Sequence, residues 1–470
     1  MMAFSAASMR KLLQFALPVA FAACMFTTPV QAATNIERIV SPGGIEAWLV
    51  REASVPLIAI DFAFHNGASQ VPADKAGLAS MTMDLLDEGA GDLDSHAFHE
   101  RMENYAIGMS FSASRDQISG SLHTLIEHQD VAFDLLKLAL TKPRFDTEAV
   151  ERIRTQMMSG LRRATTNPNE IASRRWWQVA FPGHPYATPV GGTLEAVPTI
   201  TQNDIKSFAG RIFTRDTLKI GIVGNIDAAQ AGKIVDRIFG ELPAKSKTVP
   251  IPDGKPQGLG TTVNVELDVP QSVVMLGGPG IARKDPDFMA AYILNHILGG
   301  GTFSSRLYRE VREARGLAYS VYSALIPLDH TALFFAGTAT RSDRAVQSLE
   351  VIQQEIQKIA KDGATAQELA EAKSYLKGSF ALRFDTSSKI ANQLVQMQIE
   401  DLGIDYIIKR NGLVDAVTLG DLKRVSKRIL DAGMLALVVG RAPTASVNAG
   451  GAATPVAGQP SAAPAPVQTK

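Results

Sequence analysis

The chain is almost free of cysteine, since its 470 residues contain only Cys24. A single thiol excludes an intrachain disulfide and a zinc site built on several thiolates. The chain also has no excess of charge, because 47 Lys and Arg residues balance 47 Asp and Glu residues. It therefore lacks the basic excess that is typical of nucleic-acid-binding domains. The length predicts two to four domains, each with its own core.

The chain also lacks an apolar run of the roughly 20 residues that a membrane-spanning helix needs. Its most apolar segment, residues 12–26, follows Arg10 and Lys11 and precedes the small residues of Val30-Gln31-Ala32. This arrangement is typical of an export signal, so we expect cleavage after about Ala32 and a periplasmic mature protein without cysteine. Two alternatives stay open, namely a retained membrane anchor and a lipoprotein modified at Cys24.

Two low-complexity stretches divide the rest of the chain. Residues 442–470 consist mainly of Ala, Pro, Gly, Ser and Thr, a composition that predicts a disordered tail. Residues 243–260 are rich in Pro, Gly and Lys without apolar periodicity, which is typical of a linker. The predicted organisation is a signal peptide 1–32, an N-terminal domain 33–246, a linker 247–260, a C-terminal domain 261–441 and a disordered tail 442–470.

The two halves look like tandem copies of one α+β unit. In each half a Thr lies three residues before an Asp at the start of a helical pattern, at Thr201 and at Thr418, as expected of a helix N-cap. Each half should also begin with a strand and a helix and end with a strand: 55–64, 76–86 and 217–224, then 271–276, 288–298 and 434–440. We expect an antiparallel sheet backed by helices, because strands and helices do not alternate strictly. Gly299-Gly300-Gly301 lacks the G-x-G-x-x-G spacing of a dinucleotide site.

Residues 66–89, which include Gly77-Leu78-Ala79-Ser80 and Met83-Asp84, resemble the signature region of the insulinase- and pitrilysin-like zinc metallopeptidases. In active members of that family the helix carries H-x-x-E-H, in which two His bind zinc and the Glu activates water. The resemblance implies that the two His fall on Ser80 and Asp84, the base on Met83, and a third ligand from a later helix near Gly160. Only Asp84 offers a carboxylate there, so we expect no zinc site and no bound cofactor in this chain.

The histidines elsewhere do not form the missing motif. His96 and His99 are three residues apart on a probable helix and should face solvent. His296 is the repeat-equivalent of Asp84, but Tyr292 and Asn295 flank it, and we expect a partly buried polar residue. His184 precedes a proline and should support a loop.

A dense motif occupies residues 304–322. It predicts a helix that is capped by Ser304 or Ser305 and stopped at Gly316, followed by an edge strand that carries Tyr319. The segment closely resembles the motif of the C-terminal half of the same family, in which an Arg and a Tyr seven residues apart reach across the reaction chamber.

The resemblance places those two roles on Arg312 and Tyr319. A Tyr hydroxyl can donate to the oxyanion that develops during peptide hydrolysis, and an Arg can hold a substrate carbonyl or carboxylate. The structural alternative is an ion pair of Arg312 with Glu310 or Glu313 and a core position for Tyr319.

The resemblance covers residues 36–441 and implies two homologous domains that form half of a clamshell. It further implies the zinc-lacking subunit of a periplasmic heterodimeric peptidase, whose H-x-x-E-H partner holds zinc and whose substrate is an unfolded peptide. A non-enzymatic peptide-binding or assembly protein of the same fold is the alternative, and a self-sufficient peptidase with an atypical site is the third reading. We expect neither a nucleic-acid partner nor a membrane span in the mature chain.

Overall fold

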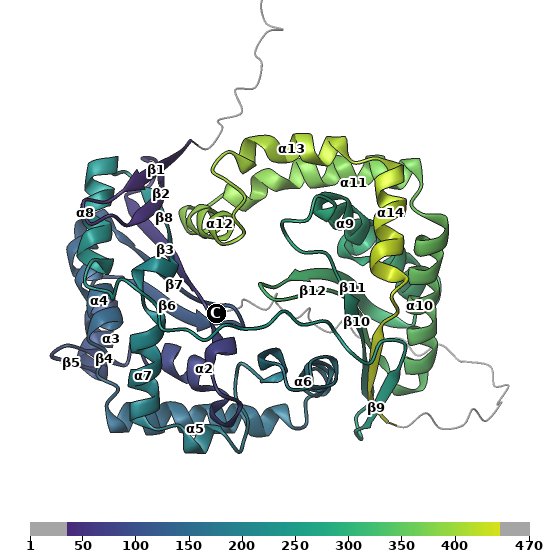
Figure 1. The fold of residues 1–470 in the computed structure, drawn as a ribbon, viewed down its shortest axis with the longest axis horizontal. Coiled ribbons are helices and arrows are strands. Elements are labelled where there is room, and N and C mark those ends of the chain that lie inside the picture. Colours follow the sequence, from purple (N-terminus) through teal and green to yellow (C-terminus); the bar gives the residue numbers. More distant parts are fainter. Residues whose placement is uncertain (1–34, 442–470) are drawn as a thin grey trace, which may run out of the picture. The chain divides into compact units, whose positions relative to one another are not determined.

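The computed structural model describes residues 35–441. The predicted export signal, Cys24 and the predicted disordered tail lie outside the described residues and stay predictions. Among the described helices, none has the length and apolar character that crossing a membrane requires. Residues 36–441 belong to one compact unit, which is built on two separate sheets (Figure 1).

The first sheet has six strands in the order β1-β2-β8-β3-β7-β6. Their bounds are β1 Ile36–Val40, β2 Glu46–Arg51, β3 Leu57–His65, β6 Gly108–Ala113, β7 Gln117–Leu125 and β8 Leu218–Gly224. The second sheet has five strands in the order β11-β12-β10-β13-β9. Their bounds are β9 Thr262–Glu266, β10 Gln271–Pro279, β11 Ala318–Pro327, β12 Ala332–Arg341 and β13 Leu435–Gly440. A short hairpin, β4 Gly89–Ala90 with β5 Leu93–Asp94, stands apart from both sheets.

The two strand orders are the same once β1 is set aside. Strands β2-β8-β3-β7-β6 of the first sheet correspond to β9-β13-β10-β12-β11 of the second, in matching chain order within each half. The pairing directions agree as well, since β2 with β8 and β9 with β13 are parallel and the other pairs are antiparallel. This match supports the predicted tandem repeat, and it adds one parallel pair to each of the expected antiparallel sheets.

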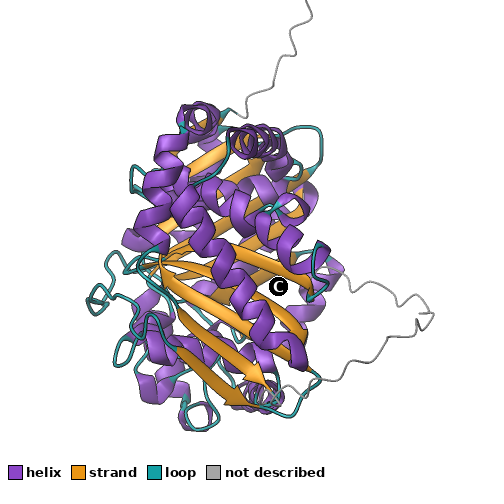
Figure 2. Ribbon diagram, turned by 90° about the vertical axis from the view of Figure 1, so that its right-hand side faces the viewer, coloured by secondary structure: helices purple, strands orange, loops and turns teal. Residues whose placement is uncertain are grey.

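Helices lie over the strands in both halves (Figure 2). The first half contains α2 Leu78–Met83, α3 Ser95–Asn104, α4 Gln129–Thr141, α5 Thr147–Ala164, α6 Pro168–Ala180, α7 Gln202–Ile212 and α8 Ala228–Phe239. The second half contains α9 Phe288–Asn295, α10 Ala345–Asp362, α11 Ala366–Gly378, α12 Ser387–Ile399, α13 Tyr406–Ala416 and α14 Leu419–Leu430. Two further segments, His296–Gly300 and Tyr308–Glu313, are π-helical, and the second replaces the ordinary helix expected before Gly316.

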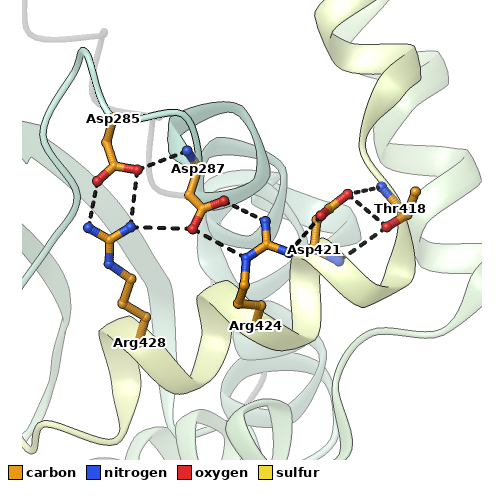
Figure 3. A network of polar contacts seen from close by, with 6 residues as sticks. All are labelled: Asp285, Asp287, Thr418, Asp421, Arg424 and Arg428. Atoms are coloured by element: carbon orange, nitrogen blue, oxygen red, sulfur yellow. Dashed lines mark hydrogen bonds and ion pairs between the residues drawn. The ribbon is translucent and has the colours of Figure 1, made fainter.

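The predicted Thr caps are present in both halves. Thr201 starts α7 and Thr418 starts α14, and each forms a capping box with the Asp three residues later, so that two backbone N–H groups are satisfied. In α14 the cap continues into ion pairs with the loop before α9 (Figure 3). Arg424 contacts Asp287 at 2.5 Å and Arg428 contacts Asp285 at 2.5 Å. These contacts fix the last long helix against the start of its own half.

Each sheet packs one face against helices of its own half. Met81 of α2, Leu136 of α4 and Phe208 of α7 join the core beneath the first sheet. Ile352 of α10 and Val425 of α14 join the corresponding core of the second sheet. Burial of these apolar faces supplies the main stabilisation of both halves.

The opposite face of each sheet is covered by a helix from the other half, which the sequence did not predict. Helix α12 packs on β8 and β3 through Leu394, and Gln398 Nε2 donates to the Ile220 carbonyl oxygen at 2.8 Å. Helix α6 packs on β13 and β10 through Trp176, whose Nε1 donates to the Leu435 carbonyl oxygen at 3.2 Å. The two halves therefore exchange one helix each.

A strand glycine permits each close approach. A Cβ on Gly221 of β8 would lie 2.5 Å from the Ala391 carbonyl oxygen of α12, and a Cβ on Gly277 of β10 would lie 2.4 Å from the Trp176 ring of α6. Both contacts are too short for a side chain, so the exchanged helices depend on glycine at these strand positions.

Candidate functional site

The helix that carries the family signature is short and ends at the positions of interest. Helix α2 spans Leu78–Met83, and Asp84 forms its C-cap. Met83 is buried in the core beneath the first sheet, whereas Ser80 and Asp84 line a cavity of 640 Å³. The predicted base position therefore lies inside the protein, and the two predicted ligand positions lie on a common wall.

Gly160 lines the same cavity from α5. A Cβ at this position would have no neighbour closer than a nitrogen of the Arg163 guanidinium, 3.9 Å away. The structure thus brings Gly160 to the same cavity as Ser80 and Asp84, although it lies 76 to 80 residues after them in the sequence. Met83 does not line this cavity.

The two polar side chains of this set are not arranged as metal ligands. The Ser80 hydroxyl donates to the Val190 carbonyl oxygen at 2.9 Å and thereby ties α2 to the loop that follows α6. Asp84 is exposed toward the cavity, and partial desolvation by the surrounding protein, together with the charge of Asp87, raises its pKa to about 6. Asp84 is therefore mostly a carboxylate at about pH 7, although it takes up a proton at a higher pH than a solvated aspartate does.

The residues present do not fit zinc. One carboxylate, one hydroxyl already used in a hydrogen bond and one glycine cannot provide the three protein ligands of a catalytic zinc site. Within residues 35–441, no group of three His, Cys, Asp or Glu side chains is placed to hold a metal ion.

Three arginines line the cavity instead, and the sequence pattern did not predict them. Arg115 follows β6, Arg163 belongs to α5 and Arg174 belongs to α6, and all three line the cavity. No carboxylate of the described chain lies within ion-pair distance of any of the three. The sequence shows Arg162-Arg163 and Arg174-Arg175 as pairs, but it does not show which member of each pair faces inward.

Arg115 is the most enclosed of these arginines. Its guanidinium stacks on the Trp177 ring at 3.7 Å, and its Nε donates to the Tyr186 carbonyl oxygen at 3.2 Å. Desolvation lowers the pKa of Arg115 to about 10, although the negative charge of Asp116 acts in the opposite direction. Asp116 itself accepts hydrogen bonds from the Tyr186 hydroxyl and the Asp329 backbone N–H. The guanidinium remains cationic at neutral pH without a direct counter-ion.

In the second half, the position equivalent to Asp84 is buried and does not line a comparable arginine-rich cavity. His296, the repeat-equivalent of Asp84, is buried and stacks on Tyr375 with ring centroids 5.0 Å apart. Burial lowers the pKa of His296. Asn295 accepts a hydrogen bond from Ser323 Oγ at 2.8 Å, and Tyr292 accepts one from Arg383 at 3.2 Å. The expectation of a buried polar residue at His296 is confirmed.

The other histidines considered from the sequence make contacts within the fold. On α3, His96 is exposed and His99 is partly buried, with its ring 3.9 Å from Asp87. His184 accepts a hydrogen bond from the Tyr186 backbone N–H and contacts the Pro252 carbonyl oxygen at 2.8 Å, so it fastens its loop to the segment between the halves. Neither position belongs to a metal site.

Arg312 and Tyr319 lie next to each other. Tyr319 is on β11, an edge strand of the second sheet, and is 77% exposed. The Arg312 guanidinium stands over the Tyr319 ring at 4.4 Å and over the Tyr308 ring at 4.9 Å. Glu310, one of the two partners that the structural alternative gives to Arg312, instead pairs with Arg315 at 2.6 Å.

The alternative of a surface ion pair and a core tyrosine does not describe this arrangement. Tyr319 is open to solvent, and no carboxylate of the described chain pairs with Arg312. A cation over an aromatic face is attracted by the ring quadrupole, which holds the guanidinium in place while its N–H groups stay available.

Residues 199–376 match the family described as "Peptidase M16 inactive domain". The resemblance to insulinase- and pitrilysin-like proteins is confirmed by this match, which covers residues 199–376 of the chain.

The relatives carry two kinds of name. The non-peptidase homolog YmxG of Helicobacter pylori is 28% identical over 341 residues, which are 72% of this chain and 78% of the relative. An uncharacterized zinc protease of Mycobacterium leprae is 25% identical over 414 residues, 86% of this chain and 91% of the relative.

Among solved structures, a peptidase M16 inactive domain from Pseudomonas fluorescens superimposes with a TM-score of 0.82 and 27% identity, and the match covers 87% of this chain and 98% of that one. A protease from Helicobacter pylori superimposes with a TM-score of 0.78 at 20% identity over 87% of this chain and 99% of that one, which supports the fold alone.

Proposed function

We propose that this chain is the zinc-lacking subunit of a periplasmic peptidase and supplies Arg312 and Tyr319 to the active site of an H-x-x-E-H partner that holds zinc. The observation that carries the proposal is the exposed Tyr319 beside a partly exposed Arg312 that forms no ion pair with a carboxylate of the described chain. Tyr319 would donate its hydroxyl proton in a hydrogen bond to the oxyanion, and Arg312 would hold a carbonyl or carboxylate of an unfolded peptide.

Co-expression with a homologue from the same organism that carries H-x-x-E-H tests the proposal. We expect the two chains to co-purify, zinc to be found in the complex and not in this chain alone, and peptide cleavage to require both. Cleavage by this purified chain by itself would contradict the proposal.

Substitution separates a role in the reaction from a role in assembly. Tyr319→Phe should lower kcat of the complex by about 100-fold, the loss that follows removal of one oxyanion donor, and leave co-purification intact. Tyr322→Phe is the matched control, because Tyr322 lies on the same strand and is 47% exposed. Equal activity of the two variants would remove Tyr319 from the reaction.

A second candidate is a non-enzymatic peptide-binding or assembly protein, and the arginine-lined cavity at α2 favours it. This candidate predicts peptide binding without any gain of cleavage in the presence of an H-x-x-E-H homologue.

Export is tested separately: N-terminal sequencing of periplasmic protein should begin at or near Ala33, whereas a lipid-modified Cys24 at the N-terminus would show the alternative processing.

A further inference from the structure

The cavity at α2 has the charge of an anion site at the place where the family would hold a cation. Arg115, Arg163 and Arg174 line it, against the carboxyl groups of Asp84 and Glu170. None of the five side chains is paired with another of the set. The positive groups outnumber the negative ones, and none of the three arginines forms an ion pair within the described chain. An anion entering the cavity would therefore meet guanidinium N–H groups of Arg163 and Arg174 that make no hydrogen bond.

A second cavity in the same chain is also lined by arginines, but these arginines have hydrogen-bond or ion-pair partners within the protein. It has a volume of 440 Å³ and lies against α9 of the other half. There, Arg283 pairs with Glu400 at 2.5 Å, Arg410 donates to the Leu376 carbonyl oxygen at 3.0 Å, and Arg383 donates to Tyr292 at 3.2 Å. Its arginines serve the fold, whereas Arg163 and Arg174 of the first cavity contact no acceptor of the described chain.

The shape and walls of the first cavity narrow the class of anion. Its 640 Å³ is within the range of sites that bury a small ligand, about 300–1,000 Å³. One wall is apolar, because Trp177 lies beneath the Arg115 guanidinium at 3.7 Å, and Met157 and Leu161 of α5 also contribute. A planar carboxylate matches the fork of an Arg guanidinium, and short apolar side chains match this wall.

We infer that the cavity beside Ser80, Asp84 and Gly160 binds the C-terminal carboxylate of a short peptide, with Arg163 and Arg174 as its ion partners and Arg115 as a fixed cation on Trp177. The choice of a peptide as ligand rests on the proposed function, whereas the choice of an anion rests on the side chains alone. The degenerate metal position is thus a ligand-binding position of opposite charge.

Calorimetry with matched peptides tests the inference on the full chain. The probes are N-acetyl-trialanine with a free C-terminal carboxylate, the same peptide as its C-terminal amide, and inorganic phosphate. We expect saturable binding of the free acid and at least about 10-fold weaker binding of the amide, the loss expected for charged hydrogen bonds. Equal binding of acid and amide, or binding of phosphate in preference to the acid, would overturn the assignment.

Two arginine pairs provide a charge-matched control. Arg163→Gln with Arg174→Gln removes two cavity cations, whereas Arg162→Gln with Arg175→Gln removes two cations from the same helices outside the cavity. The first double variant should weaken binding of the free acid at least about 10-fold, and the second should leave it within about 2-fold. The same affinity in both double variants would show only a general charge effect and overturn the inference.

A substitution on the opposite wall keeps the inference testable if the arginine variants fold poorly. Gly160→Glu places a carboxylate beside Arg163, where space is free, and should abolish binding of the acid, whereas Gly160→Ala should retain it. Unchanged binding in Gly160→Glu would overturn the inference. The binding assay and the cleavage assay with the partner test different claims. If the chain binds the free acid but the partner gains no cleavage activity, only the proposed function is refuted. If the complex cleaves peptides but this chain does not bind the free acid, only this inference is refuted.

Discussion

The two halves of this chain share strand order and pairing direction but use the helix after the equivalent strand in different ways. In the first half, α2 follows β3 and presents Ser80 and Asp84 to a cavity with unpaired arginines. In the second half, α9 follows β10, and His296 is stacked and buried beyond its end. A repeated fold therefore preserves the position of a site without preserving its chemistry, because strand order and pairing depend on the two sheets and their cores and not on the identity of these few side chains.

The exchanged helices show a second difference. Helix α6 meets the second sheet with the aromatic rings of Trp176 and Phe335, whose centroids are 4.4 Å apart. Helix α12 meets the first sheet with aliphatic side chains around Leu394. The same architectural exchange is thus stabilised by an aromatic contact on one side and by aliphatic packing on the other.

The largest expected change in the free energy of unfolding comes from substitutions that remove the contacts of the exchanged helices. Trp176→Ala should lower the free energy of unfolding by about 4 kcal/mol, because it empties a fully buried ring site and removes a hydrogen bond to Leu435. Leu394→Ala should cost about 3 kcal/mol. Urea unfolding measures both changes, and Arg175→Ala, an exposed change in α6, is the control. A loss below about 1 kcal/mol in Trp176→Ala would show that the α6 contact is not structural.

A charged contact specific to the second half comes next. Burial alone would raise the pKa of Glu368, but hydrogen bonds from Arg306 and the Thr365 backbone N–H outweigh it and lower the pKa to about 2. Because the folded pKa is below the unfolded value of about 4.5, this stabilisation is present above pH 4.5 and is lost as the pH falls toward 2.

Glu368→Gln should therefore cost about 3 kcal/mol at pH 7, since it leaves the buried Arg306 without its counter-ion, and should cost much less near pH 2. Urea midpoints measured from pH 7 downward check the slope. A loss that is independent of pH would assign the effect to packing around Arg306 and not to its charge.

The first half contains a carboxyl group whose pKa is raised, whereas that of Glu368 is lowered. Asp61 lies on β3 beneath α12, and desolvation raises its pKa to about 6 although Asn392 donates a hydrogen bond to it. A folded pKa above the unfolded value means that the protonated group favours folding below about pH 4 and that this advantage is lost as the pH rises through 6.

Asp61→Asn should then stabilise the chain by about 1–2 kcal/mol at pH 8 and by little at pH 4, with allowance for the partial exposure of the group. Thermal unfolding at the two pH values measures the difference. Destabilisation at pH 8 would mean that the Asp61 carboxylate makes a contact that the amide cannot replace.

The smallest effect concerns the cavity itself. Gly160 is in the C-terminal part of α5, with free space where a Cβ would lie, so Gly160→Ala should stabilise the chain by about 0.5–1 kcal/mol through reduced backbone entropy in the unfolded state. Thermal unfolding checks this gain, and Gly221→Ala, which would collide with α12, is the contrasting variant that should destabilise.

The sequence by itself determined the repeated α+β fold, the Thr caps of α7 and α14 and the residue types at Ser80, Met83, Asp84 and Gly160, whose match to the family's ligand and base positions stays a prediction from resemblance. These features depend on local periodicity, on capping residues three positions apart and on residue identity, all of which are readable along the chain. Only the tertiary structure decided the rest. The helix exchange, the burial of Met83 and the choice of Arg163 and Arg174 over their neighbours depend on which helix face meets which sheet, because packing between distant segments, and not the local pattern, sets the direction of each side chain.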